Sequence, residues 1–285
     1  MNPNGELVRI DDTSLFVVER GTGYPVIVLH GGPGLDHHEF ADYLDPLTDE
    51  FRLLLVDQRA NGRSERPPES TWTLERMAQD VIMLARALAL DRYAVLGHSF
   101  GAFVALQNAV DFPGMAAQTI VSSGIPSMKY LETLEENLNT FEPVELREQV
   151  IASWAREPTV STAEQSAQLM ADQFPFHFAD PSDPRIADYL DRTKDTVYAP
   201  DVLRLFSANG YGGIEVEDRL DEVQQPVLVI TGRHDRTCTV AAAEAIAAGV
   251  PNAELRIFEQ SGHMTFVEEP DLYVAIVRSF LERTA

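Results

Sequence analysis

A serine stands between two glycines in the stretch Gly97-His98-Ser99-Phe100-Gly101, directly after the apolar run YAVLG at 93–97. A helical pattern follows at once, so the serine lies at a sharp turn from a strand into a helix. Such a turn brings the positions two before and two after the serine against neighbouring backbone, which favours glycine at both. The pattern is typical of a nucleophile exposed at the carboxyl end of a sheet. The alternative is a tight turn with an incidental serine.

A nucleophilic serine requires a base, and the base requires an acid that orients it. Asp235 follows the strand-like run VLVITG, and His263 follows the run AELRIF, so both are expected at the same sheet edge as Ser99. Asp57 and Asp221 are rival acids, but Asp57 precedes the serine and Asp221 precedes its strand. We therefore predict Ser99 as nucleophile, Asp235 as acid and His263 as base.

A glycine-rich loop, HGGPG at 30–34, follows an early apolar strand. Glycines let backbone N–H groups approach a substrate closely and stabilise an oxyanion. We expect one donor from Gly31 or Gly32, a choice that the sequence leaves open, and the second from the N–H of Phe100. The spacing differs from the G-x-G-x-x-G of a dinucleotide-binding loop.

Apolar periodicity supplies the elements that must position these residues. Runs of strand type alternate with helical patterns, which predicts a mostly parallel sheet flanked by helices. The expected strands are 7–10, 15–19, 25–30, 52–57, 93–97, 118–124, 226–232 and 253–258. The expected helices are 39–48, 74–90, 100–111, 128–138, 143–156, 161–172, 184–195, 200–207, 239–248 and 270–283.

The alternation stops after residue 124 and resumes at 226. We therefore predict a core of residues 1–124 and 226–285 and an inserted helical cap of residues 125–225. Glycines at 210, 212 and 213 make the return from cap to core flexible, so it could serve as a hinge.

The composition narrows the classes of partner. The net charge of −23 argues against nucleic acids and anionic membrane surfaces, which attract basic patches. No signal peptide or membrane-spanning segment is visible among the 285 residues, so a cytoplasmic location is expected. Cys238 is the single cysteine, and His37-His38-Glu39 does not match H-E-x-x-H, so we expect neither a metal nor a cofactor. The sequence leaves the oligomeric state open.

The motifs together resemble one family. HGGPG at 30–34, DQRANGRS at 57–64, GHSFGA at 97–102, GRHD at 232–235 and SGH at 261–263 resemble the α/β-hydrolases of the prolyl iminopeptidase type. The resemblance implies an α/β-hydrolase fold with a helical cap, and a serine hydrolase without cofactor that releases N-terminal residues from small peptides. It implies the same triad and oxyanion donors as those named above.

The sequence also departs from that family. The elbow carries His98 where the peptidases usually have glycine, and His98 is a candidate for the pocket wall. The peptidases use acidic cap residues to hold the substrate's amino group, and some place a glutamate directly after the catalytic aspartate, where this chain has Arg236. Asp36 and Glu39 lie beyond the glycine loop, so we expect no spare acid from the core.

The cap must then supply the acid for an amine substrate, and Glu215 and Glu217 are the candidates because they lie where the cap returns to the core. A short peptide is the leading expectation for the substrate. A carboxylesterase or lactonase that uses the same triad is the main alternative. A lyase or cofactor-free oxygenase and a binding protein with a vestigial triad are further alternatives, because the fold alone does not decide the reaction.

Overall fold

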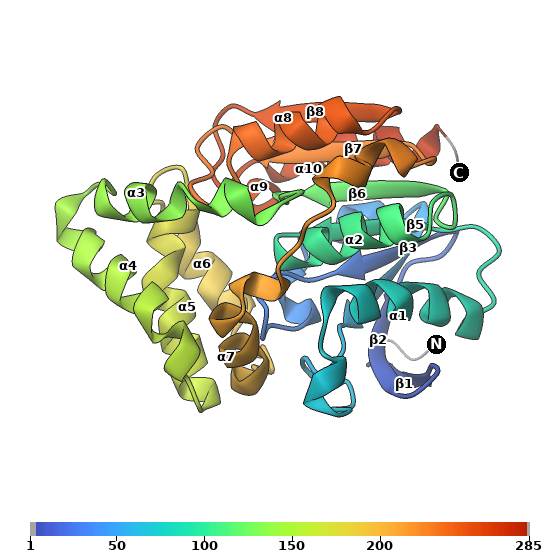
Figure 1. Cartoon of the computed structure of the whole chain (residues 1–285), viewed down its shortest axis with the longest axis horizontal. Coiled ribbons are helices and arrows are strands. Elements are labelled where there is room, and N and C mark those ends of the chain that lie inside the picture. The colour runs from blue at the N-terminus through green and yellow to red at the C-terminus, as the bar shows by residue number, and fades with distance from the viewer. Residues whose placement is uncertain (1–3, 284–285) are drawn as a thin grey trace.

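The computed structural model describes residues 4–283, which are built around a central sheet (Figure 1). The sheet has eight strands in the order β1-β2-β4-β3-β5-β6-β7-β8. The strands β1 and β2 pair with each other, and β2 with β4, in antiparallel fashion; the pairs from β4 to β8 are parallel. The strands are β1 Glu6–Arg9, β2 Ser14–Arg20, β3 Tyr24–Leu29, β4 Phe51–Asp57, β5 Ala94–His98, β6 Gln118–Ser122, β7 Val227–Gly232 and β8 Ala253–Phe258. The predicted α/β-hydrolase fold with a mostly parallel sheet is confirmed.

Helices cover both faces of the sheet. One buried cluster joins Ile27 of β3 to α1, α2 and α8, and the other joins Val26 and Val28 to α9 and α10. Neighbouring residues of β3 thus serve opposite faces, which is why its sequence is continuously apolar rather than alternating. The helices are α1 Leu74–Ala87, α2 Phe100–Asp111, α8 Val240–Gly249, α9 Thr265–Glu268 and α10 Pro270–Glu282.

The chain between β6 and β7 is helical and extends beyond the carboxyl ends of the parallel strands (Figure 1). Its α-helices are α3 Leu134–Asn139, α4 Val144–Arg156, α5 Ala163–His177, α6 Arg185–Arg192 and α7 Pro200–Ala208. Val202, Phe206 and Ile214 share a buried cluster with the sheet, so this segment packs on the core at its carboxyl-terminal end. The division into a core and a cap at residues 125–225 stays a prediction.

Two predicted helices are wrong in kind. The segment 39–48 forms two 3-10 turns, η1 His37–Phe40 and η2 Asp45–Leu47. Between them Ala41 has a φ of +42°, outside the helical region, and Pro46 lacks the N–H that a longer helix would use. The segment 128–138 is likewise divided, into the 3-10 turn η4 Met128–Leu131 and the short α3.

The structure also extends one predicted helix and adds one that the sequence did not predict. The helix α5 continues to His177, five residues beyond the predicted end at 172, and passes through Pro175. The helix α9 was not predicted, because its four residues are too few to show a helical period. Within residues 4–283, none of the helices combines the length and the apolar character needed to cross a membrane.

Candidate active site

Ser99 stands at the turn from β5 into α2 with a φ of +53° and a ψ of −119°, a backbone conformation that a serine rarely adopts. Glycine is required at positions 97 and 101, because neighbouring backbone approaches both of them closely. A Cβ on Gly97 would lie 2.1 Å from the carbonyl oxygen of Gly101, and one on Gly101 would lie 2.2 Å from that of Leu29. The elbow therefore holds the serine in a strained position that its packed surroundings enforce.

His263 and Asp235 meet at the ends of β8 and β7. The Nδ1 atom of His263 lies 2.7 Å from Oδ2 of the buried Asp235. The other oxygen, Oδ1, accepts hydrogen bonds of 2.9 Å from the backbone N–H groups of Thr237 and Cys238. An ionised carboxylate only accepts, so Nδ1 carries the proton and Nε2 is left as the basic nitrogen.

Burial and the ion pair act in opposite directions on this pair. Burial alone would raise the pKa of Asp235, but the charge and hydrogen bond of His263 hold it below its usual value. Burial alone would lower the pKa of His263, but the Asp235 carboxylate outweighs it and the pKa is raised. The geometry thus favours an ionised acid that stabilises the imidazolium formed when the histidine takes a proton.

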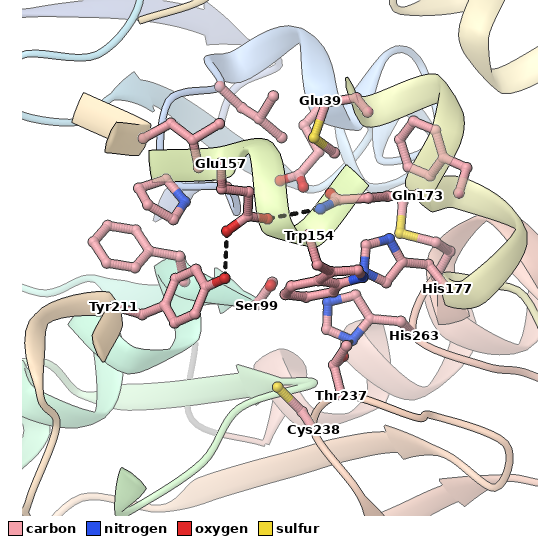
Figure 2. A pocket seen from close by; sticks show the side chains of 18 of the residues that line it. Glu39, Ser99, Trp154, Glu157, Gln173, His177, Tyr211, Thr237, Cys238 and His263 are labelled. Atoms are coloured by element: carbon pink, nitrogen blue, oxygen red, sulfur yellow. Dashed lines mark hydrogen bonds between the residues drawn. The ribbon is translucent and has the colours of Figure 1, made fainter. Parts of the chain in front are cut away.

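Ser99 and His263 face one cavity, whose wall is largely apolar (Figure 2). In the described part of the chain no hydrogen bond joins the two, and such contacts are often looser before substrate binds. Much of the wall comes from the helical segment between β6 and β7. Its residues there are Leu131, Leu134, Trp154, Glu157, Met170, Gln173, Phe174, His177, Leu203 and Tyr211.

The structure distinguishes between Gly31 and Gly32, the two candidate oxyanion donors of the glycine loop. The N–H of Gly31 donates to the carboxylate of Glu39 and is therefore occupied. Gly32 lines the cavity, and among the described residues its N–H has no partner. Phe100 is the first residue of α2, so its N–H is one of the unpaired donors at a helix amino terminus. Gly32 and Phe100 are the pair available to an oxyanion.

The prediction that Glu39 lies away from the site is wrong. Because η1 turns back after the glycine loop, its side chain lines the cavity and is buried. A methyl group added to Gly31 would lie 2.6 Å from Oε1 of Glu39 and 3.0 Å from Cβ of Ser99, so the acid and the serine lie on the same side of Gly31. Burial raises the pKa of Glu39 to about 7.

Glu157 is a second acid of the cavity, and the sequence did not predict it. It follows α4, lines the same cavity and is buried. Its Oε1 accepts a 2.7 Å hydrogen bond from Nε2 of Gln173 and its Oε2 accepts one from the Tyr211 hydroxyl (Figure 2). Burial raises its pKa despite both bonds. Its place at the end of a predicted helix is equally typical of a solvated charge, so no sequence signal distinguished it.

The two cap candidates from the sequence analysis lie elsewhere. Glu215 is exposed and accepts a hydrogen bond from the N–H of Met128. Glu217 pairs with Lys129 at 2.7 Å and accepts from the Tyr130 hydroxyl. Neither lines the cavity, because both side chains turn toward η4 instead.

His98 is also placed outside the cavity wall. It is fully buried, and its ring centroid lies 5.0 Å from that of His263. Burial holds the pKa of His98 well below its ordinary value, so the residue is neutral. It packs against the histidine of the site rather than against a substrate.

Asp57, the rival acid, is committed to a structural network. Its Oδ1 lies 2.6 Å from Nδ1 of His37, and its Oδ2 accepts a 2.8 Å bond from the N–H of Arg63.

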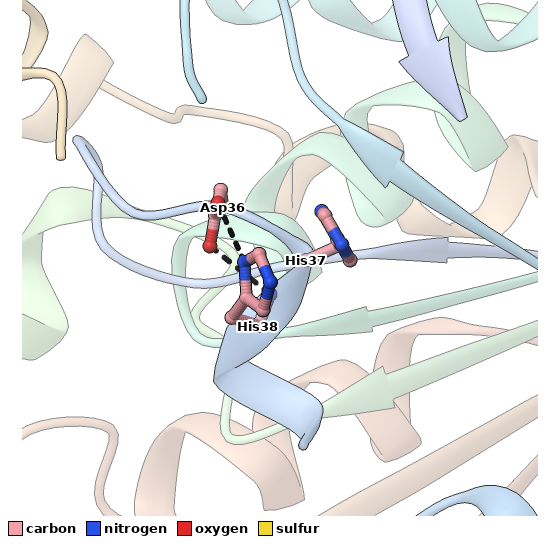
Figure 3. Close-up of side chains that lie close together, drawn as sticks. All are labelled: Asp36, His37 and His38. Carbon is pink, nitrogen blue, oxygen red and sulfur yellow. Dashed lines mark hydrogen bonds and ion pairs between the residues drawn. The ribbon is translucent and has the colours of Figure 1, made fainter. Parts of the chain in front are cut away.

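Asp36 and His38 form a similar pair at 2.8 Å (Figure 3). Asp36, His37 and His38 offer atoms close enough to hold a metal ion, a cluster that the sequence analysis did not anticipate. Each imidazole Nδ1 already faces a carboxylate, which fits a hydrogen-bonded support for η1 and its Glu39.

Comparison with known proteins agrees with this architecture. A model of the alpha/beta hydrolase fold family matches residues 24–270. The chain belongs to the α/β-hydrolase fold family. This hydrolase is 28% identical over 271 residues to a proline iminopeptidase of Heyndrickxia coagulans, covering 92% of both chains. It is 27% identical to a proline iminopeptidase of Saccharolobus solfataricus, covering 93% of this chain and 86% of the relative.

Solved structures resemble the hydrolase over almost its full length. A proline iminopeptidase of Mycobacterium smegmatis superposes with a TM-score of 0.76 at 25% identity, covering 98% of both chains. An esterase of Exiguobacterium antarcticum superposes with a TM-score of 0.75 at 21% identity, covering 98% of this chain and 99% of the esterase, and shows the fold alone. The resemblance to the prolyl iminopeptidase type is thereby confirmed.

Proposed function

We propose that this hydrolase is a serine hydrolase in which Ser99 attacks a carbonyl carbon and His263 takes the serine proton on Nε2. Asp235 holds the imidazole in that tautomer through Nδ1. The N–H groups of Gly32 and Phe100 stabilise the oxyanion. The histidine then returns the proton to the leaving group, and water releases the acyl group by the same steps in reverse order.

We further propose that the substrate is a short peptide with a free amino terminus, from which the first residue is released. The observation that carries this proposal is the pair of buried acids, Glu39 and Glu157, in an otherwise largely apolar cavity beside Ser99. A desolvated ammonium group requires a carboxylate partner, whereas a neutral acyl group does not. The relatives named proline iminopeptidase support the same substrate class.

Glu39 is the better placed acid for the substrate's α-ammonium group. That nitrogen is separated from the attacked carbonyl carbon by a single carbon atom, so its partner must lie close to Ser99. Glu39 lies on the same side of Gly31 as the serine, and its Oε1 is not used by the N–H of Gly31. Both oxygens of Glu157 are already engaged, by Gln173 and Tyr211.

Matched substrates test this proposal. Glu39→Gln, Glu157→Gln and the exposed control Glu215→Gln would each be assayed with proline and alanine aminoacyl reporters and with short acyl esters. We expect the Glu39 variant to lose about 2–5 kcal/mol in kcat/KM on the amine substrates, the cost of an unpaired buried charge. The esters should be almost unaffected, and the control should match the wild type on both.

The ester reading is the alternative that the structure also favours in one respect. The cavity wall is mainly apolar, and Glu157 already has protein partners for both oxygens. Under that reading the wild type would prefer acyl esters, and neither Gln variant would discriminate between the two substrate types. Equal losses on both types would instead indicate damage to the cavity.

A further inference from the structure

Arg236 follows the acid Asp235 in the chain, yet its side chain is not part of the cavity wall. It reaches to the carboxyl-terminal end of α5 instead. Its guanidinium donates to the carbonyl oxygens of Phe176 at 3.0 Å, Phe178 at 2.6 Å and Ala179 at 3.1 Å. The last carbonyls of a helix lack partners within the helix and attract cations, so these contacts close the end of α5.

The guanidinium is also held by aromatic rings. Its central carbon lies 5.3 Å from the ring centroid of Phe141 and 6.0 Å from that of Phe176. In the described residues its hydrogen bonds go to carbonyl oxygens and none to a carboxylate. A lysine could not make these contacts in the same way, because a compact ammonium lacks the planar fork.

The loop that carries His263 is attached to the same end of α5. The N–H of His263 donates to the carbonyl oxygen of His177 at 2.7 Å. A Cβ on Gly262 would lie 2.5 Å from that oxygen, so the two segments are in direct backbone contact. Glu268 joins them a second time, because its two oxygens accept 2.8 Å bonds from the N–H groups of Ala179 and Gly262.

These contacts couple one wall of the cavity to the triad. Gln173, Phe174 and His177 of α5 line the cavity, and the His177 ring centroid lies 5.1 Å from that of His263. A shift at the end of α5 would therefore move the wall and the backbone of His263 together.

We infer that Arg236 is a positioning residue that fixes the end of α5 relative to the loops that carry Asp235 and His263. The inference rests on the proposed serine chemistry but not on the choice between peptide and ester. A residue that acts through His263 must affect every substrate that Ser99 attacks, whereas a substrate contact would affect one class only.

The test compares Arg236→Lys and Arg236→Ala with Arg233→Ala, which removes an exposed ion pair to Glu259 in the same loop. Lysine keeps the charge beside Asp235 but loses the fork. We expect Arg236→Ala to lower kcat about tenfold or more on both amine and ester substrates with little change in KM, and Arg236→Lys to restore only part of it. The Arg233 variant should match the wild type.

Two readouts separate this inference from the proposed function. Hydrogen exchange should show faster exchange of the Ala179 and His263 amides in both Arg236 variants, whatever substrate the enzyme uses. Labelling of Ser99 by a serine-directed phosphonate should slow by the same factor as kcat. A loss confined to KM for amine substrates, or lower thermal stability with kcat and labelling unchanged, would overturn the inference. Absence of labelling in the wild type would contradict the serine mechanism, while the exchange result would still test the role of Arg236 at the end of α5.

Discussion

Ser99, Asp235 and His263 come from three separate turns, and only the contact between the last two is already formed, at 2.7 Å. Members of a triad act as a unit, so their losses should not multiply. We expect Ser99→Ala to remove nearly all turnover, His263→Ala to cost a comparable amount, and the double variant to cost little more. Residual catalysis of roughly 10³ over water would remain from binding and the oxyanion donors. Steady-state kinetics at a known concentration of folded protein would measure these losses.

Multiplying losses in the double variant would mean that Ser99 and His263 act independently, contrary to the proposed mechanism. Asp57→Asn tests whether Asp57, rather than Asp235, is the acid of the triad, since Asp57 is instead bound to His37 and the N–H of Arg63. It should reduce stability rather than turnover per folded molecule.

Glu39 makes the stability of the protein depend on pH. Burial raises its pKa from 4.5 to about 7, so the folded state binds this proton more tightly than the unfolded chain does. The resulting stabilisation is fully present below pH 4.5 and is lost as the pH rises through about 7. Glu39→Gln removes that loss, so the variant should exceed the wild type by up to about 3 kcal/mol at pH 8 and by much less at pH 5.

Urea unfolding at the two pH values measures this difference. Glu215→Gln is the matched control, because Glu215 is exposed and should change stability little at either pH. A Glu39 variant that is less stable than the wild type at pH 8 would show that the bond to Gly31 outweighs the cost of burying the charge.

At the scale of the element, the turn from β5 into α2 depends on close backbone contact. A Cβ on Gly101 would lie 2.2 Å from a main-chain oxygen of β3, which cannot move without disturbing the sheet. Gly101→Ala should therefore destabilise the protein by about 1–3 kcal/mol or more and reduce turnover as the elbow shifts. Thermal unfolding and kinetics on the folded fraction would report both effects.

Gly249→Ala is the comparison for that substitution. The three atoms nearest to its Cβ would belong to the Leu220 side chain, with Cδ1 at 2.7 Å and Cβ at 2.8 Å, so Leu220, which lies outside the sheet, must shift. The substitution should cost clearly less stability and leave turnover unchanged. Equal costs at the two glycines would show that the elbow tolerates a Cβ and that its glycine is not a steric requirement.

At the scale of the whole molecule, the net charge of −23 sets up a field that attracts cations. Substrates with a free ammonium group should therefore lose kcat/KM a few-fold when salt shortens the screening length from about 30 Å at 0.01 M to about 3 Å at 1 M. Neutral acyl esters should show almost no such dependence. Kinetics on both substrate types across a salt series measure it, with an uncharged osmolyte as control. If salt lowered kcat/KM equally for amine and ester substrates, the cause would be an effect of salt on the protein and not the attraction of the charged substrate.

The sequence by itself determined the parts of this protein that depend on local sterics and on the order of elements. Short stretches of sequence are enough to predict the strands of the sheet and the elbow at Ser99. Buried parallel strands must be apolar, and this strand-to-helix turn must be flanked by glycine. Asp235 and His263 could be named because each follows a parallel strand, and all such ends meet at one sheet edge. The short elements η1 and α9 could not be predicted, because four residues are too few to show a helical period.

Only the tertiary structure decided which charged side chains belong to the site. Glu39 and Glu157 look like ordinary solvated acids in the sequence, and they enter the cavity because η1 turns back on the glycine loop and the end of α4 packs beside α5. Glu215 and Glu217 looked equally suitable and turn toward η4. A side chain's direction depends on the packing of elements distant in the sequence, and that packing is a sum over many contacts that no short stretch of residues contains.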